Sequence, residues 1–319
     1  MSLGGLAGFA LVFVLCTWTL SAAGGLALVG SRARLMRLGP LAERRAAVIA
    51  AITPVALASI VVAALVLRSR LGVDHCPTHG HHAHLCLAHG AQWLERAWVL
   101  AALALGGAVM IGRCARLLSS FLRGARGVRE LHALSRAADG VRIVESARAF
   151  CFVADRGRPA IYVSSRAWSS LCEAERAALV AHEAAHIHQG DLRTRAAIEA
   201  FLVLAAPGIA PRIRDTWLRA SERLCDARAA RATGRPESVA SALVSLCRLQ
   251  VGRPAAGLGF TPRVDELAGR VRAVLDGGPL GERAAAILRR AAAVACAMLV
   301  AAAAVAADPL HHALETLLG

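Results

Sequence analysis

The sequence predicts a mainly α membrane protein, with four transmembrane helices and an α+β domain inserted between the third and the fourth. The chain has 319 residues, of which 56% are hydrophobic, and a mean hydropathy of +0.52. This composition is too apolar for an ordinary soluble domain of the same length. Four stretches approach the roughly 20 apolar residues that a bilayer-spanning helix needs. A long segment with strand and helix signals separates the last two and predicts the folded domain.

The predicted spans divide the chain into three parts. These are residues 1–118, with three transmembrane helices and an outer loop, residues 119–288, with the folded domain, and residues 289–319, with the fourth helix and a short outer tail. The spans are predicted at about 6–29, 46–67, 97–112 and 291–307, and the outer loop at 71–95. The third span is short before Arg113, which would have to reach the membrane surface with its long side chain. The fourth span is rich in alanine, so a buried helix is the alternative there.

Arginine sets the predicted orientation of the spans. The sequence contains no lysine, so arginine supplies the whole basic count behind the net charge of +15, a usage typical of GC-rich bacterial genomes. It is concentrated between the first two spans, after the third and before the fourth. By the positive-inside rule these flanks are cytoplasmic, which places both termini and the outer loop outside the cell membrane and the inserted domain inside. The flanking arginines would meet anionic lipid, and without a recognition motif direct nucleic-acid binding is not expected.

The inserted domain contains a motif with the spacing of a metal site. His182, Glu183 and His186 form the pattern H-E-x-x-H. On a helix, two histidines four residues apart share a face and can bind one Zn²⁺, while the glutamate can take a proton from water at the metal. A helix is expected because Ser170–Glu173 has the form of a capping box and Gly190 can end the helix. The pattern predicts a zinc-peptidase site, and its alternative is a solvated helix face.

A site of this kind needs a third protein ligand and one open position. Glu222 and Asp226 lie one helical turn apart later in the domain. Glu222 can bind the metal, and Asp226 can accept the free N–H of a ligand histidine and fix its tautomer. The same spacing also fits an ordinary surface pair beside neighbouring arginines.

Other polar residues near these positions are weaker candidates as ligands. His188 is predicted to face away from the metal, because it follows His186 by two residues and lies about 200° around the helix. Asp191 follows the glycine that ends the helix and would hold that end or a nearby arginine. Cys225 is expected to pack as a small apolar group.

The remaining signals in the domain concern strands and one apolar segment. Short strands are predicted at Val141–Ser146, Ala149–Ala154 and Pro159–Ser164. Residues Ala196–Pro211 are apolar, but Glu199 and two prolines interrupt them, which favours a buried or membrane-grazing helix over a fifth span. An edge strand among residues 141–164 is the predicted partner of an extended substrate.

At these residues the chain resembles the membrane metallopeptidases of the BlaR/MecR type, which are zinc peptidases of the gluzincin class. The resemblance lies in the segments 158–163, 181–187, 190–191, 222–226 and 270–275. The order of three spans, a peptidase domain and a fourth span also fits that family.

The resemblance implies a gluzincin-type domain that binds one zinc ion through His182, His186 and Glu222. It implies further that Glu183 is the general base and that Asp226 orients a ligand histidine. The expected activity is that of an integral-membrane zinc metalloendopeptidase that hydrolyses peptide bonds at the cytoplasmic face. Its substrate would be a cytoplasmic transcriptional repressor or the peptidase itself, in a signalling pathway.

The oxyanion that forms during peptide hydrolysis needs a donor besides the metal. Tyr162, Arg228 and Arg231 are candidates, and the sequence does not distinguish among them.

One departure from the family is large. The β-lactam-sensing members carry an extracellular penicillin-binding domain after the fourth span, whereas only residues 308–319 follow it here. A Ser-x-x-Lys acylation motif also needs a lysine, which the sequence lacks. Two alternatives therefore stand beside the signalling peptidase. One is an HtpX-like quality-control membrane peptidase, and the other is a non-enzymatic membrane protein that handles metal.

The outer loop is the second unusual segment. Between residues 74 and 89 it contains six of the 12 histidines and two cysteines. Outside the membrane, Cys76 and Cys86 could form a disulfide. The cysteines and histidines could instead bind a second metal, Zn²⁺ or Cu⁺. A solvated, low-complexity loop is the third interpretation.

Overall fold

The computed structural model describes residues 3–71, 96–155, 157–250 and 264–305. Most of these residues are helical, and they include one small sheet. The helices are α1 (Leu3–Gly30), α2 (Arg32–Leu38), α3 (Pro40–Leu71), α4 (Ala97–Leu134), α5 (Ser165–Ser170), α6 (Glu173–Gln189), α7 (Asp191–Leu202), α8 (Ile209–Thr233), α9 (Pro236–Gln250), α10 (Val264–Asp276) and α11 (Glu282–Val305). The strands are β1 (Ser135–Ala138), β2 (Val141–Val144), β3 (Cys151–Asp155) and β4 (Pro159–Ser164). The outer loop and its cysteines and histidines lie outside the described residues, as does the predicted outer tail.

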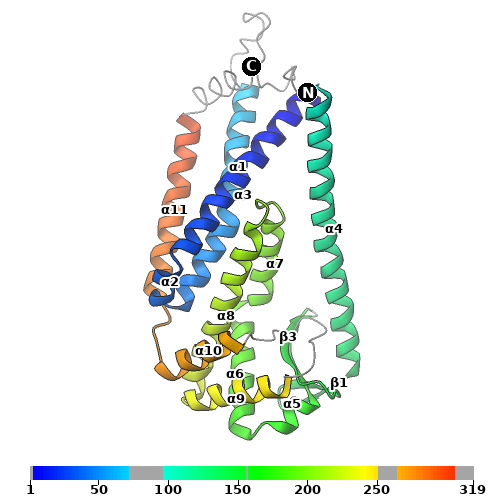
Figure 1. Cartoon of the computed structure of the whole chain (residues 1–319), viewed down its shortest axis with the longest axis vertical. Helices are drawn as coiled ribbons and strands as arrows, with labels where there is room; N and C mark the ends of the chain where they lie inside the picture. Colours follow the sequence, from blue (N-terminus) through cyan, green and yellow to red (C-terminus); the bar gives the residue numbers. More distant parts are fainter. Residues whose placement is uncertain (1–2, 72–95, 156, 251–263, 306–319) are drawn as a thin grey trace, which may run out of the picture.

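Four helices of the described part are long and apolar enough to cross a membrane (Figure 1). They lie in α1, α3, α4 and α11, at Leu6–Gly30, Pro40–Leu67, Ala97–Leu134 and Glu282–Ala302. The four apolar stretches of the sequence are thus confirmed as long helices, although α3 and α11 begin earlier than predicted and α4 runs further. The helices are longer than the apolar stretches because apolarity marks only the residues that suit lipid. Helical backbone hydrogen bonds continue into the flanking segments that contain arginine.

The third long helix is the clearest case of this difference. α4 contains 38 residues, which at 1.5 Å per residue make about 57 Å, roughly twice the apolar thickness of a bilayer. Arg113 was expected to extend its side chain to the membrane surface. Its guanidinium donates two hydrogen bonds of 3.0 Å, to the carbonyl of Leu202 at the end of α7 and to that of Ala205 in the turn that follows. The last carbonyls of a helix lack partners within the helix, so they offer Arg113 acceptors.

α3 is the helix around which the others pack. It contacts α1, α8, α11 and α7. Beyond its first turns, α4 stands apart from α1, α3 and α11 (Figure 1). Near the start of α4, Val99 packs against Ala7 of α1.

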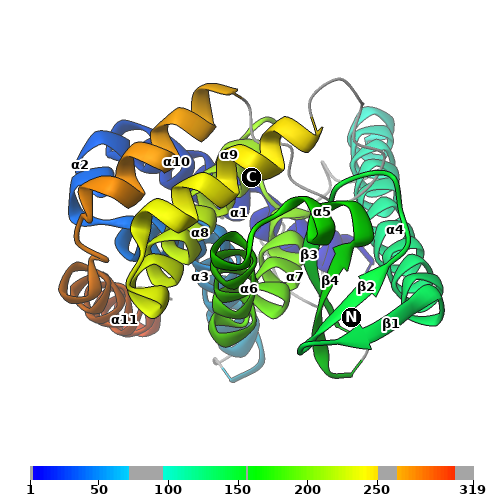
Figure 2. The same ribbon diagram turned by 90° about the horizontal axis from the view of Figure 1, so that it is seen from below.

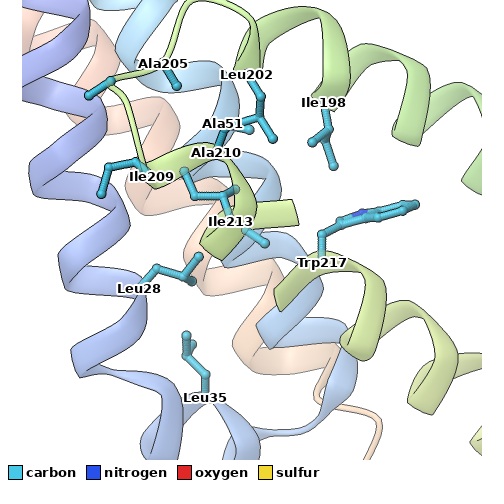
Figure 3. Close-up of a cluster of buried hydrophobic side chains, with 12 residues drawn as sticks. Leu28, Leu35, Ala51, Ile198, Leu202, Ala205, Ile209, Ala210, Ile213 and Trp217 are labelled. Carbon is cyan, nitrogen blue, oxygen red and sulfur yellow. The ribbon is translucent and has the colours of Figure 1, made fainter. Parts of the chain in front are cut away.

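The turn between α7 and α8 reaches up among the long helices (Figure 1). Isoleucine and leucine side chains of both helices meet Leu28 of α1 and Ala51 of α3 in a buried cluster (Figure 3). The backbone N–H of Ala206 in the turn donates to Ser21 Oγ of α1 at 3.0 Å. The expectation of burial for this apolar segment is confirmed. The expectation of one helix is wrong, because Pro207 cannot continue a helix and Gly208 takes a positive φ of 78°.

The sheet has the strand order β1-β2-β4-β3, with a parallel β2–β4 pair between two antiparallel pairs (Figure 2). β2, β3 and β4 correspond to the three predicted strands, and β1 was not predicted. On one face Ile161 and Val163 pack against Leu179 of α6. On the other face Tyr162 packs with Val128 of α4. The sheet therefore lies between the metal-motif helix and the end of α4, and β3 forms the edge of the sheet nearest to α6 (Figure 2).

The loops that precede α3 and α11 are fixed to one another. The backbone N–H of Leu41 donates to the Leu280 carbonyl at 3.0 Å. Gly39 has a φ of 108° and Gly281 a φ of 84°, and a Cβ on either glycine would overlap backbone atoms of the opposite loop. Only glycine allows both this φ and this approach.

Gly281→Ala should destabilise the protein more than Gly277→Ala. Both residues have positive φ, but a Cβ at Gly277 would meet no atom within 4 Å. Gly277→Ala should cost about 1–2 kcal/mol for the backbone conformation alone. Gly281→Ala should cost roughly 1–3 kcal/mol more, because the two loops must separate. Denaturant unfolding of the full chain in detergent measures the difference, and equal losses would show that the close approach contributes nothing.

Candidate metal centre

Two packed helices carry the residues of the predicted metal motif. α6 holds His182, Glu183 and His186, and α8 holds Glu222 and Asp226. These helices are in contact along the domain.

The start of α6 differs from the sequence prediction. Ser170 completes the short helix α5, so the predicted capping box at Ser170–Glu173 is wrong. Cys172 is the N-cap residue, and its backbone N–H donates to Glu175 Oε2 at 3.0 Å. The predicted end at Gly190 is confirmed, because this residue takes a left-handed φ of 64°.

Three ligand atoms converge on one point. His182 Nε2 and His186 Nε2 are 3.2 Å apart. Glu222 places Oε2 3.5 Å from the first nitrogen and Oε1 3.5 Å from the second. Two ligands of a tetrahedral zinc ion, each at roughly 2.0–2.1 Å, are separated by about 3.3–3.4 Å. The triad therefore has the spacing of three corners of a zinc tetrahedron, with the fourth corner left for another ligand.

The other nitrogen of each histidine faces a carboxylate. Asp226 Oδ1 lies 2.9 Å from His182 Nδ1, and Asp191 Oδ2 lies 2.7 Å from His186 Nδ1. An ionised carboxylate only accepts hydrogen bonds, so each Nδ1 carries a proton, and with metal bound each Nε2 would present a lone pair to the ion. The two Nε2 atoms lie at hydrogen-bonding distance, 3.2 Å, so the position between them suits a cation, either a proton or a metal ion. The tautomers therefore fit a metal site.

The electrostatics of the buried cluster favour a bound cation. Burial opposes protonation of His182, but the Asp226 and Glu222 carboxylates outweigh it and raise its pKa to about 10. Burial also opposes ionisation of Glu222, yet Arg270 and the two histidines hold its pKa at about 2. Without metal, the His182 side chain is therefore positively charged at neutral pH. A bound metal ion would take the place of that charge.

Glu183 lies beside the triad and is 7% exposed. Burial raises the pKa of its carboxyl, and the positive charge of the histidines offsets only part of this effect. Cys151 of β3 is close enough for its thiol to hydrogen-bond to Glu183. Nothing in the sequence around Cys151 places it beside the motif.

Three further residues near the triad were missed or only partly anticipated. Asp191 was expected to hold the helix end or an arginine, and it contacts both Arg44 and His186. Arg270 donates to both oxygens of Asp226, at 2.7 and 2.8 Å. Arg44 and Arg270 lie far from the motif in the sequence, so helix periodicity does not connect them with it.

Among the candidate oxyanion donors, the structure places Tyr162 away from the triad. The Tyr162 hydroxyl is 2.9 Å from His132 Nδ1, on the face of the sheet that packs against α4. Within the described residues, no hydrogen bond or ion pair joins Arg228 or Arg231 to the triad, and Arg231 is exposed. His188 is exposed, as its helix position predicts.

Cys225 is fully buried, as expected for an apolar side chain. Its sulfur accepts a hydrogen bond of 3.1 Å from Gln189 Nε2 and lies 3.9 Å from Asp191 Oδ2. Together with Asp191 and His186, Cys225 forms a second group of residues at metal-ligand spacing. Because Asp191 is already paired with Arg44, this group supports the His186 side of the triad rather than a separate site.

Comparison with models of known protein families, with curated proteins and with solved structures finds no match for this chain.

The double variant His182→Ala/His186→Ala should lose one equivalent of zinc per chain, because two of the three ligand atoms are removed. Glu183→Gln should retain that zinc, since Glu183 is not part of the triad. His188→Ala is the matched control, as its side chain is exposed on the same helix. Metal content of the purified chain, measured by mass spectrometry, tests this. Equal zinc content in the double variant and its parent would exclude the triad as the binding site.

Zinc binding should release about one proton per chain near pH 7, because His182 is protonated there with a pKa of about 10. Below that pKa the apparent zinc affinity should rise about tenfold per pH unit, since a proton competes with the metal. Titration calorimetry in buffers of different ionisation enthalpy measures the proton count. Asp226→Asn should reduce the release, as it removes a carboxylate that raises this pKa. Zinc affinity independent of pH between 6.5 and 8.5 would contradict the assignment.

Proposed function

We propose that this protein is an integral-membrane zinc metalloendopeptidase that hydrolyses peptide bonds at the cytoplasmic face of a bacterial cell membrane. The observation that carries the proposal is the triad of His182, His186 and Glu222 at tetrahedral spacing, with Glu183 next to the first ligand. Three protein ligands and one open corner are typical of catalytic zinc, whereas structural zinc sites have four protein ligands.

A bound zinc ion supplies Lewis acidity, which polarises the scissile carbonyl and acidifies water. Glu183 takes the proton of the attacking water on its carboxylate and delivers it to the nitrogen of the leaving amine. Burial raises the pKa of Glu183, which makes its carboxylate a stronger base than an exposed glutamate. Asp226 and Asp191 hold the Nδ1 protons of the two histidines, so that both Nε2 atoms stay aimed at the same point.

The position of β3 supports a peptide substrate. β3 is the terminal strand of the sheet and contacts α6, the helix that carries Glu183. Its outer edge offers backbone N–H and carbonyl groups to which an extended peptide can add as a further strand. Cys151 lies on this strand and beside Glu183, so a peptide along β3 would pass the general base.

The resemblance to BlaR/MecR-type peptidases suggests the biological role. Three long apolar helices precede α6 and one follows the domain, which is the order of helices in that family. The substrate would then be a cytoplasmic repressor or the chain itself. An HtpX-like quality-control peptidase is the second candidate with the same chemistry. A non-enzymatic protein that handles metal would not need Glu183.

Glu183→Gln should abolish peptide-bond hydrolysis while zinc stays bound, because the variant keeps the triad and loses the base. A loss of roughly 10²–10⁴-fold is expected for removing a general base. Comparative proteomics of cells with the parent and with Glu183→Gln should find cytoplasmic cleavage products only with the parent. Identical peptide profiles from both strains, with zinc bound in each chain, would exclude a peptidase and favour metal handling.

The metal centre should face the cytoplasm. This expectation rests on the arginines between the first two spans, since residues 31–39 lie at the same end of the long helices as α6 (Figure 1). A cysteine at the exposed position Glu237, in a chain without other cysteines, should resist a membrane-impermeant maleimide in intact cells and react after lysis. Labelling in intact cells would invert the topology and place the substrate outside.

A further inference from the structure

Behind each ligand histidine lies an aspartate that is held by an arginine from another part of the chain. In the first of these triplets, Arg44 contacts Asp191, whose other oxygen lies 2.7 Å from His186 Nδ1. Arg44 also donates to Ser221 Oγ at 3.2 Å and to the Gln189 carbonyl at 3.5 Å. One guanidinium therefore joins the aspartate behind His186 to the end of α6 and to the residue before Glu222 on α8.

The second triplet is built in the same way around the other histidine. Arg270 donates from Nε and Nη2 to the two oxygens of Asp226, at 2.7 and 2.8 Å. Asp226 in turn lies 2.9 Å from His182 Nδ1. Nη2 of the same arginine is 3.1 Å from Glu222 Oε2. The planar fork of Arg270 thus fixes the orientation of a metal ligand and of the carboxylate behind another.

The two arginines also balance the charge of the centre. Four carboxylates of the described residues surround the two histidines, namely Glu183, Asp191, Glu222 and Asp226. Arg44 and Arg270 neutralise two of these charges, and a divalent cation neutralises the other two. A buried carboxylate without its arginine would be unpaired, which is costly in a medium of low dielectric constant. It would turn away from its histidine or take up a proton.

Neither arginine belongs to the helices that carry the ligands. Arg44 lies near the start of α3, the second of the long apolar helices. Its neighbour Glu43 accepts a hydrogen bond of 2.9 Å from Arg223, the residue after Glu222. Arg270 lies on α10, which leads into α11 through the loop that is fixed to the start of α3. Both arginines are therefore supplied by the assembly of α3, α10 and α11.

We propose that Arg44 and Arg270 are positioning residues for the metal centre, which is complete only when the start of α3 and α10 are docked on α6 and α8. Each arginine acts through its aspartate on one ligand histidine. The inference rests on the metal triad of the proposed function and not on peptidase activity, so the measurements follow the bound metal.

The test measures zinc affinity of the full chain in lipid nanodiscs, by competition with a chromophoric chelator. Arg44→Gln and Arg270→Gln should each weaken zinc binding roughly 10–100-fold, as expected for partners behind a metal ligand. The visible spectrum of Co²⁺ bound in place of zinc should also change, because the imidazole orientation changes. Arg214→Gln is the matched control, since Arg214 makes a two-point ion pair with Glu199 on the α7–α8 hairpin and touches no ligand. It should leave both affinity and spectrum unchanged.

Double variants separate positioning from general destabilisation. The double variant Arg44→Gln/Asp191→Asn should bind zinc about as tightly as whichever of its two single variants has the lower zinc affinity, because both changes interrupt the same triplet. Additive losses would show that Arg44 does not act through Asp191 and would overturn the first triplet. Parental affinity and spectrum in folded Arg44→Gln and Arg270→Gln chains would overturn the proposal as a whole.

If a glutamine variant fails to fold, the zinc affinity of the corresponding lysine variant tests the same arginine. Lysine retains the charge but offers no planar fork. Arg44→Lys should therefore recover most of the zinc affinity, since Asp191 receives one contact from Arg44. Arg270→Lys should recover less, because Asp226 receives two. Equal, complete recovery at both positions would show that charge alone matters and would exclude positioning by Arg270.

Docking of the start of α3 and of α10 on the ligand helices is tested by hydrogen exchange. Because coupling between two events is reciprocal, zinc should slow amide exchange at residues 40–46 and 264–276 in the parent chain. The effect should disappear in Arg44→Gln for the first segment and in Arg270→Gln for the second. Protection that is the same in parent and variants would contradict the coupling while leaving the metal triad and its chemistry untouched.

Discussion

The packing of α6 against α8 places two imidazoles and several carboxylates in one buried volume, and the surrounding structure is arranged to satisfy the resulting charge. His182, His186 and Glu222 aim their ligand atoms at one point, and their other polar atoms are occupied by aspartates and arginines. Repulsion between the buried carboxylates makes this cluster unfavourable without compensating positive charge. The same features make it a strong candidate for a metal centre that orients its ligands in advance.

The long helices contribute to this centre as well as to membrane insertion. α3 packs against α1, α11 and α8, so a single helix joins the long apolar helices to a ligand helix. The α7–α8 hairpin reaches among the long helices and is held there by Arg113 and Ser21. A metal centre anchored in this way lies beside the start of α3, one of the long apolar helices.

The small sheet places one of its edges beside the helix that carries the metal motif. β4 alternates between two faces, so that Ile161 and Val163 pack toward α6 while Tyr162 packs toward α4. The sheet is thereby fixed on both faces, and its terminal strand β3 lies beside α6. Cys151 on that strand is within hydrogen-bonding reach of Glu183 on the helix, so in the proposed peptidase a peptide along β3 would lie beside the general base.

Local patterns in the sequence were sufficient for the long helices, three of the four strands and the three residues of the candidate triad. Helical periodicity relates residues within about one turn, so the spacing of His182 to His186 and of Glu222 to Asp226 could be interpreted directly. The terminal glycine of α6 was also predictable, because a left-handed residue favours glycine. Apolarity located the four long helices but not their ends, since backbone hydrogen bonds continue past the apolar residues.

The tertiary structure alone decided which distant side chains complete the centre. Arg44 and Arg270 are separated from the motif by whole helices, and their role depends on how α3 and α10 pack against α8. Tertiary packing also places the Arg113 side chain at the end of α7. It places Tyr162 on the face of the sheet that is turned away from α6. The sequence determined which residue types could bind a metal. Only packing determined which carboxylates and arginines stand behind them, because Coulomb and hydrogen-bond energies depend on distances that chain separation does not encode.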